Sequence, residues 1–226
     1  MPQSPSAGAQ TLARGLQTLR SVALSADGLT LQEITERQGI HRTVAYRILG
    51  TLTAEGLIHK GHDGRYRGAT GLLTLAPAGH AALRSAAMEP LQQAADRLGA
   101  TTALLINEGG EAVALAVVPP RAPRYHIAFS EGSRHPLDRG SAGLALRALR
   151  PPTNEDAEDV RDARAAGHAR TFGQVEPGMH GLATPVRIGS TDACVNLITH
   201  RDDHLDAAVP VLRETADAIA AAVAEN

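Results

Sequence analysis

Residues 30–68 read TLQEITERQGIHRTVAYRILGTLTAEGLIHKGHDGRYRG, a stretch that predicts two short helices, a tight turn and a two-stranded ribbon. Thr30 followed three residues later by Glu33 is a capping box, in which each side chain satisfies a backbone donor at the start of a helix. Gly39 predicts the end of this helix, because glycine adopts the left-handed conformation without steric cost. A second helix is expected from Arg42 to about Glu55, ending before Gly56.

The second helix has an apolar side and a basic, hydrogen-bonding side. The residues expected to be buried are Ala45, Ile48, Leu49 and Leu52. Those on the opposite side are Arg42, Thr43, Tyr46 and Arg47. The ribbon that follows, with a turn at His62–Gly64, adds Lys60, Arg65 and Arg67.

This arrangement predicts a winged helix-turn-helix that binds double-stranded DNA. Arginine and lysine neutralise phosphates, while a few groups of fixed geometry read base edges in the major groove. Arg47 is the strongest candidate for a base or phosphate contact, and Arg42 is expected at a phosphate. The alternative is an amphipathic helix pair whose basic side is simply solvated, and for Tyr46 the alternative is packing against the wing.

Charge is divided along the chain in the way that this interpretation requires. The 226 residues have a net charge of −2, but residues 1–77 hold eight Lys and Arg against five Asp and Glu. The positive excess therefore lies in the part that would meet DNA. With no Trp, two Phe and three Tyr, the chain lacks the aromatic residues of a platform for single strands. We expect a cytoplasmic protein, because the first ten residues do not resemble a secretory signal and a single cysteine suits a reducing compartment.

Helical and β-type patterns predict the rest of the organisation. Gln10–Ala23 is expected as a first helix with Leu12, Leu16 and Leu19 on one stripe. After the wing, a helical connector interrupted near Pro77 is expected to end at Gly99, and its alanine-rich surface is a candidate meeting place for two chains. The expected domains are a disordered tail (1–8), the winged helix-turn-helix (9–69), a linker helix (70–90) and a C-terminal domain (91–226).

The C-terminal part predicts an α+β domain with one antiparallel sheet. The strands are expected at 102–107, 112–118, 125–129, 181–187 and 193–199, with a hairpin at residues 108–111. Residues 134–137 are expected to lead into a helix from about Ser141 to Leu149. A further helix capped by Thr153 and Asp156 is expected to end near Gly167, and a last helix carries Val209, Leu212, Ala216, Ile219 and Val223 on one side.

The chain resembles the IclR family of bacterial transcription regulators over nearly its whole length. In the first domain the resemblance lies in Gly39-Ile40, Arg47-Ile48-Leu49, Gly56-Leu57-Ile58, Gly64-Arg65-Tyr66, Gly68 and Leu72-Leu73. In the second it lies in Pro136-Leu137, Gly143-Leu144-Ala145-Leu146, Val175-Glu176-Pro177-Gly178 and Leu182-Ala183-Thr184-Pro185-Val186. The resemblance implies a winged helix-turn-helix, a linker helix and a GAF-like effector-binding domain.

Differences from the family pattern cluster near the expected pocket. Leu144 stands where the family usually has lysine, and Val44 where it has threonine. Thr171, Gly173 and Gln174 stand where acidic residues are usual before the glutamate-proline-glycine turn. The resemblance therefore does not identify the effector.

A helix that begins near Ser141 suggests where a small organic anion would bind, because its free N–H groups and dipole attract a carboxylate. The polar residues that could converge there are Arg134, Ser141, His180, Thr184 and Asn196. For each of them the alternative is an ordinary structural role, such as capping the helix or lying on a solvated strand.

Other chemistry has little support in the sequence. Gly140-Ser141-Ala142-Gly143 is only half of a nucleophile elbow, since Arg139 takes the place of its first glycine. His200 and His204 are four residues apart but lack a third placed metal ligand. Cys194 lies in an apolar run and is expected to be buried. We therefore expect no catalytic residues, metal or cofactor.

These observations predict a ligand-responsive regulator that binds a palindromic operator as a dimer, with a tetramer left open. Its partners are expected to be duplex DNA and a small-molecule effector, with no membrane. Repression and activation are not distinguished. The alternative is a ligand-binding sensor that acts by protein contact and does not bind DNA.

Overall fold

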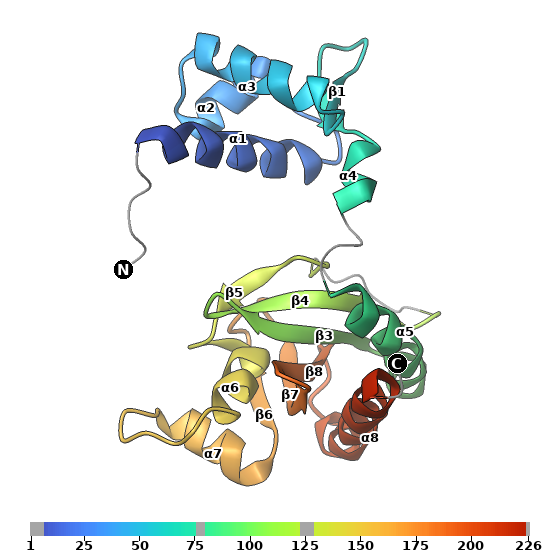
Figure 1. Ribbon diagram of the computed structural model, residues 1–226. Helices are drawn as coiled ribbons and strands as arrows, with labels where there is room; N and C mark the ends of the chain where they lie inside the picture. The colour runs from blue at the N-terminus through green and yellow to red at the C-terminus, as the bar shows by residue number, and fades with distance from the viewer. Residues whose placement is uncertain (1–6, 76–79, 123–128, 225–226) are drawn as a thin grey trace. The chain divides into compact units, whose positions relative to one another are not determined.

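The computed structural model describes residues 7–75, 80–122 and 129–224. The chain divides into two compact units, Met1–Gly79 and His80–Asn226 (Figure 1). This division falls within the predicted linker, residues 70–90. Among the described residues, none of the helices combines the length and the apolar character that crossing a membrane requires.

The first unit is a three-helix core with a β-ribbon. Its helices are α1 (Ala7–Ala23), α2 (Leu31–Gln38) and α3 (Arg42–Ala54), followed by strands β1 (Ile58–Lys60) and β2 (Tyr66–Gly68) and the short helix α4 (Gly71–Leu75). The two strands are antiparallel and pair Ile58 with Gly68. This is the predicted winged helix-turn-helix.

The predicted caps of the helix-turn-helix are confirmed. The Thr30 side chain accepts from the Glu33 N–H, and the Glu33 carboxylate accepts from the Thr30 N–H at 2.7 Å. Gly39 has φ 59°, and its N–H donates to the Thr35 carbonyl oxygen. The four residues predicted on the buried side of α3 are all buried: Ala45, Ile48, Leu49 and Leu52.

Helix α1 differs from its predicted packing. Leu12 and Leu16 are 65% and 55% exposed, whereas Val22 near its C-terminal end is fully buried. Seventeen residues of helix span about 25 Å, so the eight-residue α2 can cover only part of α1. Leu12 and Leu16 instead line a shallow groove between α1 and α3.

The second unit is built on a six-stranded antiparallel sheet in the order β5-β4-β3-β8-β7-β6. The strands are β3 (Thr101–Glu108), β4 (Glu111–Val118), β5 (Arg134–Pro136), β6 (Ala169–Phe172), β7 (His180–Ile188) and β8 (Thr191–Thr199). The single antiparallel sheet predicted from the sequence is confirmed. Strand β3 pairs with both β4 and β8, which places it at the centre.

Each face of this sheet is covered by two helices (Figure 1). Helices α5 (Ala81–Leu98) and α8 (Leu205–Ala224) pack on one face, where they share a core with side chains such as Leu104, Leu182 and Leu197. Helices α6 (Gly140–Ala148) and α7 (Glu158–Ala166) pack on the other, against Leu105, Ala183 and Cys194. Successive strand residues therefore serve different cores.

Two predicted elements of this unit need correction, and one strand was not predicted. The segment expected to lead into α6 is itself the edge strand β5. The unpredicted strand is β6. Helix α7 starts later than expected, because Asp156 accepts from both the N–H and the hydroxyl of Thr153 and forms an ion pair with Arg164, so these groups close a turn ahead of the helix. The predicted strand 125–129 falls largely outside the described residues, and Phe129 belongs to no helix or strand.

Candidate functional sites

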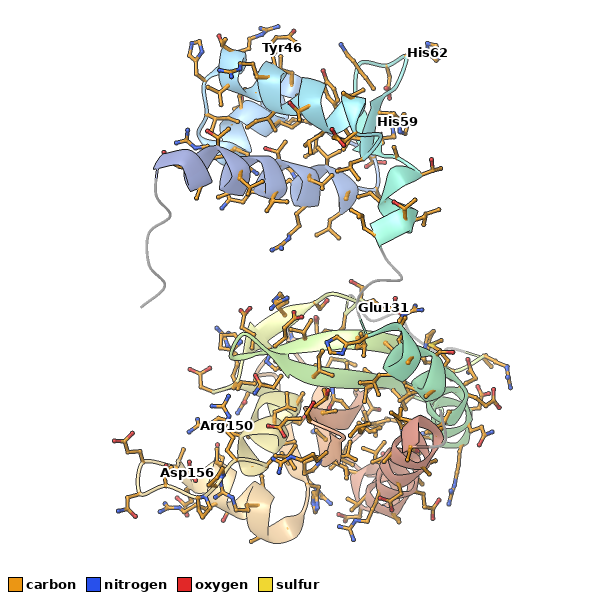
Figure 2. The ribbon with its side chains drawn as sticks, in the orientation of Figure 1. Tyr46, His59, His62, Glu131, Arg150 and Asp156 are labelled. Carbon is orange, nitrogen blue, oxygen red and sulfur yellow. The ribbon has the colours of Figure 1, made fainter. Side chains whose placement is uncertain are left out.

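The outer side of α3 carries the four side chains that the sequence placed there. Arg42, Thr43, Tyr46 and Arg47 are all exposed, and Figure 2 shows Tyr46 on the side of α3 that faces away from α1. The helix begins at His41, whose Nδ1 accepts from the Thr43 N–H at 3.3 Å. A histidine in this role was not predicted, since serine, threonine, aspartate and asparagine are the usual caps.

Arg42 and Tyr46 interact with each other across one helical turn. The Arg42 guanidinium carbon lies 5.7 Å from the centre of the Tyr46 ring, a cation–π distance. A hydrogen bond from Arg42, with its charge, lowers the pKa of the Tyr46 phenol. Tyr46 is 49% exposed, so its ring and hydroxyl remain accessible to a partner.

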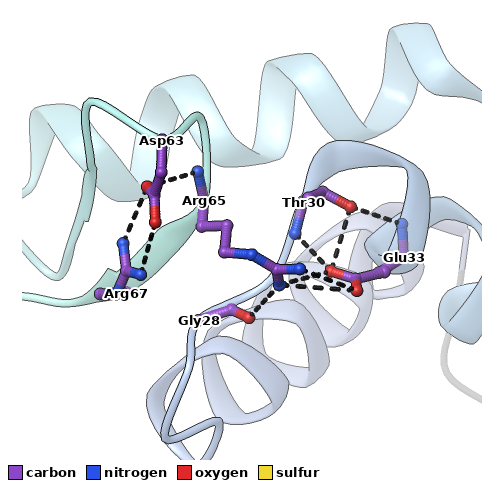
Figure 3. Close-up of polar contacts among 6 residues, drawn as sticks. All are labelled: Gly28, Thr30, Glu33, Asp63, Arg65 and Arg67. Carbon is purple, nitrogen blue, oxygen red and sulfur yellow. Dashed lines mark hydrogen bonds and ion pairs between the residues drawn. The ribbon is translucent and has the colours of Figure 1, made fainter.

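The basic residues of the wing have different surroundings. Lys60 is exposed and lies 5.7 Å from the Tyr66 ring centre. Arg67 forms two parallel bonds with Asp63, at 3.0 and 2.7 Å. Arg65 reaches back to the first helices, where it donates to the Gly28 carbonyl oxygen in the turn before α2 at 2.9 Å and to Glu33 of α2 at 3.1 Å (Figure 3).

These bonds make Arg65 and Arg67 structural braces in the DNA-free protein. Their carboxylate partners carry opposite charge, and the pKa of Glu33 is lowered by bonds from Thr30 and by Arg65. The pKa of Asp63 is lowered chiefly by its bonds from Arg67. Any contact of Arg65 or Arg67 with DNA stays a prediction, and it would require these side chains to share or exchange their partners.

In the second unit a small cavity lies at the N-terminal end of α6. It brings together three of the five predicted effector residues, namely Ser141, His180 and Asn196. The Ser141 hydroxyl donates to Asn196 Oδ1 at 2.8 Å, and both residues are buried. Gly140 opens the helix with φ 73°, a conformation that favours glycine.

The other two predicted effector residues lie elsewhere. Arg134 forms ion pairs with Glu108 and Glu111 at the edge of the sheet. Its neighbour His135 is the buried residue of β5 and lines the cavity. Thr184 alternates with Ala183 along β7 and therefore faces the α8 side, where its buried hydroxyl has no hydrogen-bond partner among the described residues.

Several residues of the cavity wall are not among the five predicted effector residues. His135, Gln174, Glu176 and Met179 all line it, as does Phe129. Of these, the family resemblance had placed Gln174 near the expected pocket. Strand alternation could have selected His135 over Arg134, once the segment was recognised as a strand. The residues of the β6–β7 loop carry no local signal of this kind, because only the tertiary fold brings the loop onto α6.

The arrangement offers binding groups rather than a catalytic pair. The Ser141 hydroxyl is bonded to an amide, and in the described part of the chain no group of three His, Cys, Asp or Glu is placed to hold a metal ion. Cavity polarity comes from backbone N–H groups, hydroxyls, carboxamides, imidazoles and the Glu176 carboxylate. Such a set can orient a small ligand by hydrogen bonds.

Known proteins share the helix-turn-helix of the first unit and the fold of both units. Residues 11–61 match the IclR helix-turn-helix domain. The HTH-type transcriptional regulator Rv1719 of Mycobacterium tuberculosis (strain ATCC 25618 / H37Rv) is 32% identical over 152 residues, which cover 66% of this chain and 58% of that protein. The chain thus matches less than two thirds of the length of this curated relative.

Two solved structures extend the similarity over nearly the whole chain. An IclR family transcriptional regulator from Brucella abortus is 25% identical, with a TM-score of 0.68 over 94% of this chain and 92% of that one. An IclR homologue from Microbacterium hydrocarbonoxydans, solved in complex with 4-hydroxybenzoate, is 22% identical, with a TM-score of 0.80 over 96% and 100%. The second likeness is one of fold.

A winged helix-turn-helix followed by a GAF-like α+β domain defines a class of transcription regulators. Residues 11–61 carry the helix-turn-helix domain of IclR regulators, and both units share the fold of a solved IclR family transcriptional regulator.

Proposed function

We propose that this protein binds a palindromic operator as a dimer and that a small organic acid, bound in the cavity beside α6, changes its affinity for that operator. The observation that carries the proposal is the outer side of α3, where Arg42, Thr43, Tyr46 and Arg47 are exposed together on a helix whose opposite side is buried. A rigid helix with this surface has the geometry for a major groove.

The basic residues are assigned different roles according to their surroundings. Arg47 and Arg42 are proposed to contact base edges or phosphates, and Lys60 at the wing is proposed to contact a phosphate. Arg65 and Arg67 hold the wing against α2 through Glu33 and within itself through Asp63. A braced wing keeps Lys60 at a constant distance from α3, which a fixed operator register requires.

The effector part of the proposal rests on the cavity. Its wall combines apolar side chains with the N-terminal end of α6, where a partial positive charge develops from the helix dipole. The 4-hydroxybenzoate complex of the Microbacterium hydrocarbonoxydans homologue makes that compound a reasonable first probe. A dimer is proposed because two copies of α3 would match the symmetry of a palindrome. A cytoplasmic location is proposed because DNA is found there.

The test is to select and sequence the fragments of the source genome that the purified full-length protein retains. We expect a shared palindromic sequence and an affinity that falls steeply with salt, because each neutralised phosphate releases counterions. Retention without sequence preference, or without salt dependence, would contradict operator binding. Adding 4-hydroxybenzoate and related acids to the same assay then measures coupling to the effector.

The second candidate is a sensor that acts by protein contact alone. The two wing arginines favour it to a limited extent, because their ion pairs reduce the positive charge available to DNA. This candidate predicts ligand binding with no salt-sensitive retention of any fragment.

A further inference from the structure

The cavity beside α6 is small in this structure. Its volume is about 40 Å³, enough for roughly three water molecules. Pockets that hold organic ligands measure about 300–1,000 Å³. For any effector to bind there, part of the wall has to move.

One segment of the wall is joined to α6 by a hydrogen bond. The Gly140 N–H at the start of α6 donates to Gln174 Oε1 at 2.7 Å. Next to it, Val175 packs so closely that a Cβ on Gly140 would lie 2.6 Å from Val175 Cγ2. The carboxamide oxygen of Gln174 therefore occupies the position where the helix end would bind an acceptor from a ligand.

Two glycines with positive φ flank the segment that carries Gln174. It lies between β6 and β7, is flanked by Gly173 with φ 64° and Gly178 with φ 72°, and is closed at its base where the Gly173 N–H donates to the Met179 carbonyl oxygen at 2.8 Å. Gln174, Val175, Pro177 and Gly178 are exposed on its outer side. We call residues 173–178 the lid.

A second donor in the cavity wall is the side-chain amide of Asn196. Asn196 is 6% exposed, and its Oδ1 accepts from Ser141, which leaves its amide NH₂ without a partner in the described part of the chain. Among the described residues that line the cavity, none is Lys or Arg, and Glu176 on the lid adds a negative charge. The donors that these residues offer to a ligand are neutral groups and the helix end.

We propose that Gln174 is the latch of this lid, and that the effector opens it by placing a carboxylate oxygen on the Gly140 N–H in place of Gln174 Oε1. The carboxylate binds the helix end more strongly than a neutral carboxamide does, because the hydrogen bond is charge-assisted. The second carboxylate oxygen is available to the Asn196 amide. This inference rests on one part of the proposed function, namely that the cavity is the effector site.

The latch is tested first without any ligand. We would measure amide hydrogen exchange of the full-length protein by NMR for the unsubstituted chain, Gln174→Ala and Gln174→Glu, with Gln93→Ala as control. Gln93 is an exposed glutamine of the same unit whose side chain, among the described residues, bonds to Glu89 on its own helix α5. Gln174→Ala should raise exchange at Gly140 and in the lid about three- to tenfold, the worth of one net hydrogen bond.

The glutamate variant should change amide exchange at Gly140 in the opposite direction. Gln174→Glu delivers a charged oxygen to Gly140, so exchange there should slow. Amides of the central strands β3 and β8 should not change in either variant, which separates unlatching from general loss of stability. Unchanged exchange at Gly140 in both variants overturns the latch.

The ligand class is tested with sodium benzoate and its neutral counterpart benzamide as probes. Benzoate should protect the Gly140 amide at a concentration about three- to tenfold lower in Gln174→Ala than in the unsubstituted chain, and at a higher concentration in Gln174→Glu, because each variant changes what the ligand must displace. The carboxylate assignment is overturned if the protecting benzoate concentration is the same in all three proteins. It is also overturned if benzoate does not protect Gly140, or if benzamide protects it equally well.

Failure of this inference and failure of the proposed function give different results. If benzoate protects Gly140 as expected but leaves retention of genomic fragments unchanged, the latch is supported and effector control of DNA binding is contradicted. If retention responds to an organic acid while Gly140 and the lid are unaffected, the regulator stands and the latch does not.

Discussion

The two units use polar side chains in opposite ways. The wing of the first unit is held by ion pairs, Arg65–Glu33 and Arg67–Asp63, whose side chains are 34–49% exposed. The cavity of the second is organised by a neutral pair, Ser141 and Asn196, that are 3% and 6% exposed. The ion pairs of the wing lie where water solvates their charges, while the buried cavity uses neutral groups that cost less free energy to bury.

This difference indicates which residues can serve function without loss of structure. An exposed ion pair contributes about 0–1 kcal/mol, so its members can be exchanged or shared at little cost. A buried hydrogen bond cannot lose one partner without leaving the other unsatisfied, at about 1–3 kcal/mol. We therefore expect the first unit to tolerate changes in its polar groups and the second to resist them.

The largest effect is expected from Gly181→Ala in the cavity. A Cβ at Gly181 would lie 2.5 Å from the Ser141 hydroxyl oxygen and 3.1 Å from that of Thr171. The added methyl group forces Ser141 away from Asn196, so the free energy of unfolding should fall by about 2–3 kcal/mol in urea denaturation.

A double variant identifies the cause of that loss. With Ser141→Ala the nearest atom to the new methyl is removed, so the two substitutions together should cost less than the sum of their separate costs. Additive costs would show that the clash with Ser141 is not responsible.

The next effect concerns DNA binding. Unlike Gly181→Ala, this substitution should leave the free energy of unfolding unchanged. Arg47→Ala removes an exposed side chain from the outer side of α3 and should weaken operator binding by about 1–3 kcal/mol in a gel-shift titration. Arg20→Ala removes the same charge from the exposed surface of α1 and serves as control. Equal losses in the two variants would mean that net charge, not the position of Arg47, sets the affinity.

A smaller effect is expected at Glu33, where the cap and the wing brace meet. Glu33→Ala removes the acceptor for the Thr30 N–H and the partner of Arg65, and should lower the free energy of unfolding by less than Gly181→Ala does. Glu36→Ala on the same helix removes only an exposed bond to Gln32 and should change little. A loss at Glu36 as large as that at Glu33 would contradict the capping role.

Acid should weaken the wing but not the Ser141–Asn196 pair. The pKa of Glu33 is lowered, first by the Thr30 N–H and then by the Thr30 hydroxyl and Arg65. A carboxylate whose folded pKa lies below its unfolded pKa stabilises the fold at high pH, and this contribution is lost as pH falls below about 4.3, the ordinary value for glutamate. Glu33→Gln should therefore flatten the fall in unfolding free energy between pH 5 and pH 3, and an unchanged slope would argue against the brace.

The smallest effect is expected at Cys194. Its side chain is fully buried between β8 and α6, and burial raises the pKa of the thiol. The native protein should not react with a thiol reagent such as DTNB at pH 8, and reaction should begin only in denaturant. Rapid labelling of the native protein would mean that this side of the sheet opens readily.

The first unit was predictable nearly residue by residue. Its helix starts and ends depend on local chemistry, as with Thr30, Glu33 and Gly39, and its core positions follow the helical period. The exceptions are Leu12 and Leu16, which lie on the predicted stripe of α1 but are exposed. Periodicity shows which residues share a side of a helix, but not how far along the helix its neighbours reach.

The effector cavity was predictable only in part, since its members come from β5, α6, β7, β8 and the lid. The sequence selected Ser141, His180 and Asn196 correctly as neighbours of one cavity. It selected Arg134 and Thr184 as well, and each points away by one step of strand alternation. A shift of one residue moves a side chain to the other face, and register is decided by pairing with other strands.

The sequence alone determined what depends on contacts between near neighbours: the capped helices, the turn, the wing and the two sides of α3. Tertiary structure decided what depends on distant segments meeting, namely that Arg65 braces α2 and that Gln174 occupies the end of α6. Local hydrogen bonds and periodicity are set within a few residues, whereas a bond such as Gly140–Gln174 joins segments 34 residues apart. Only the packed sheet and its helices bring those segments together.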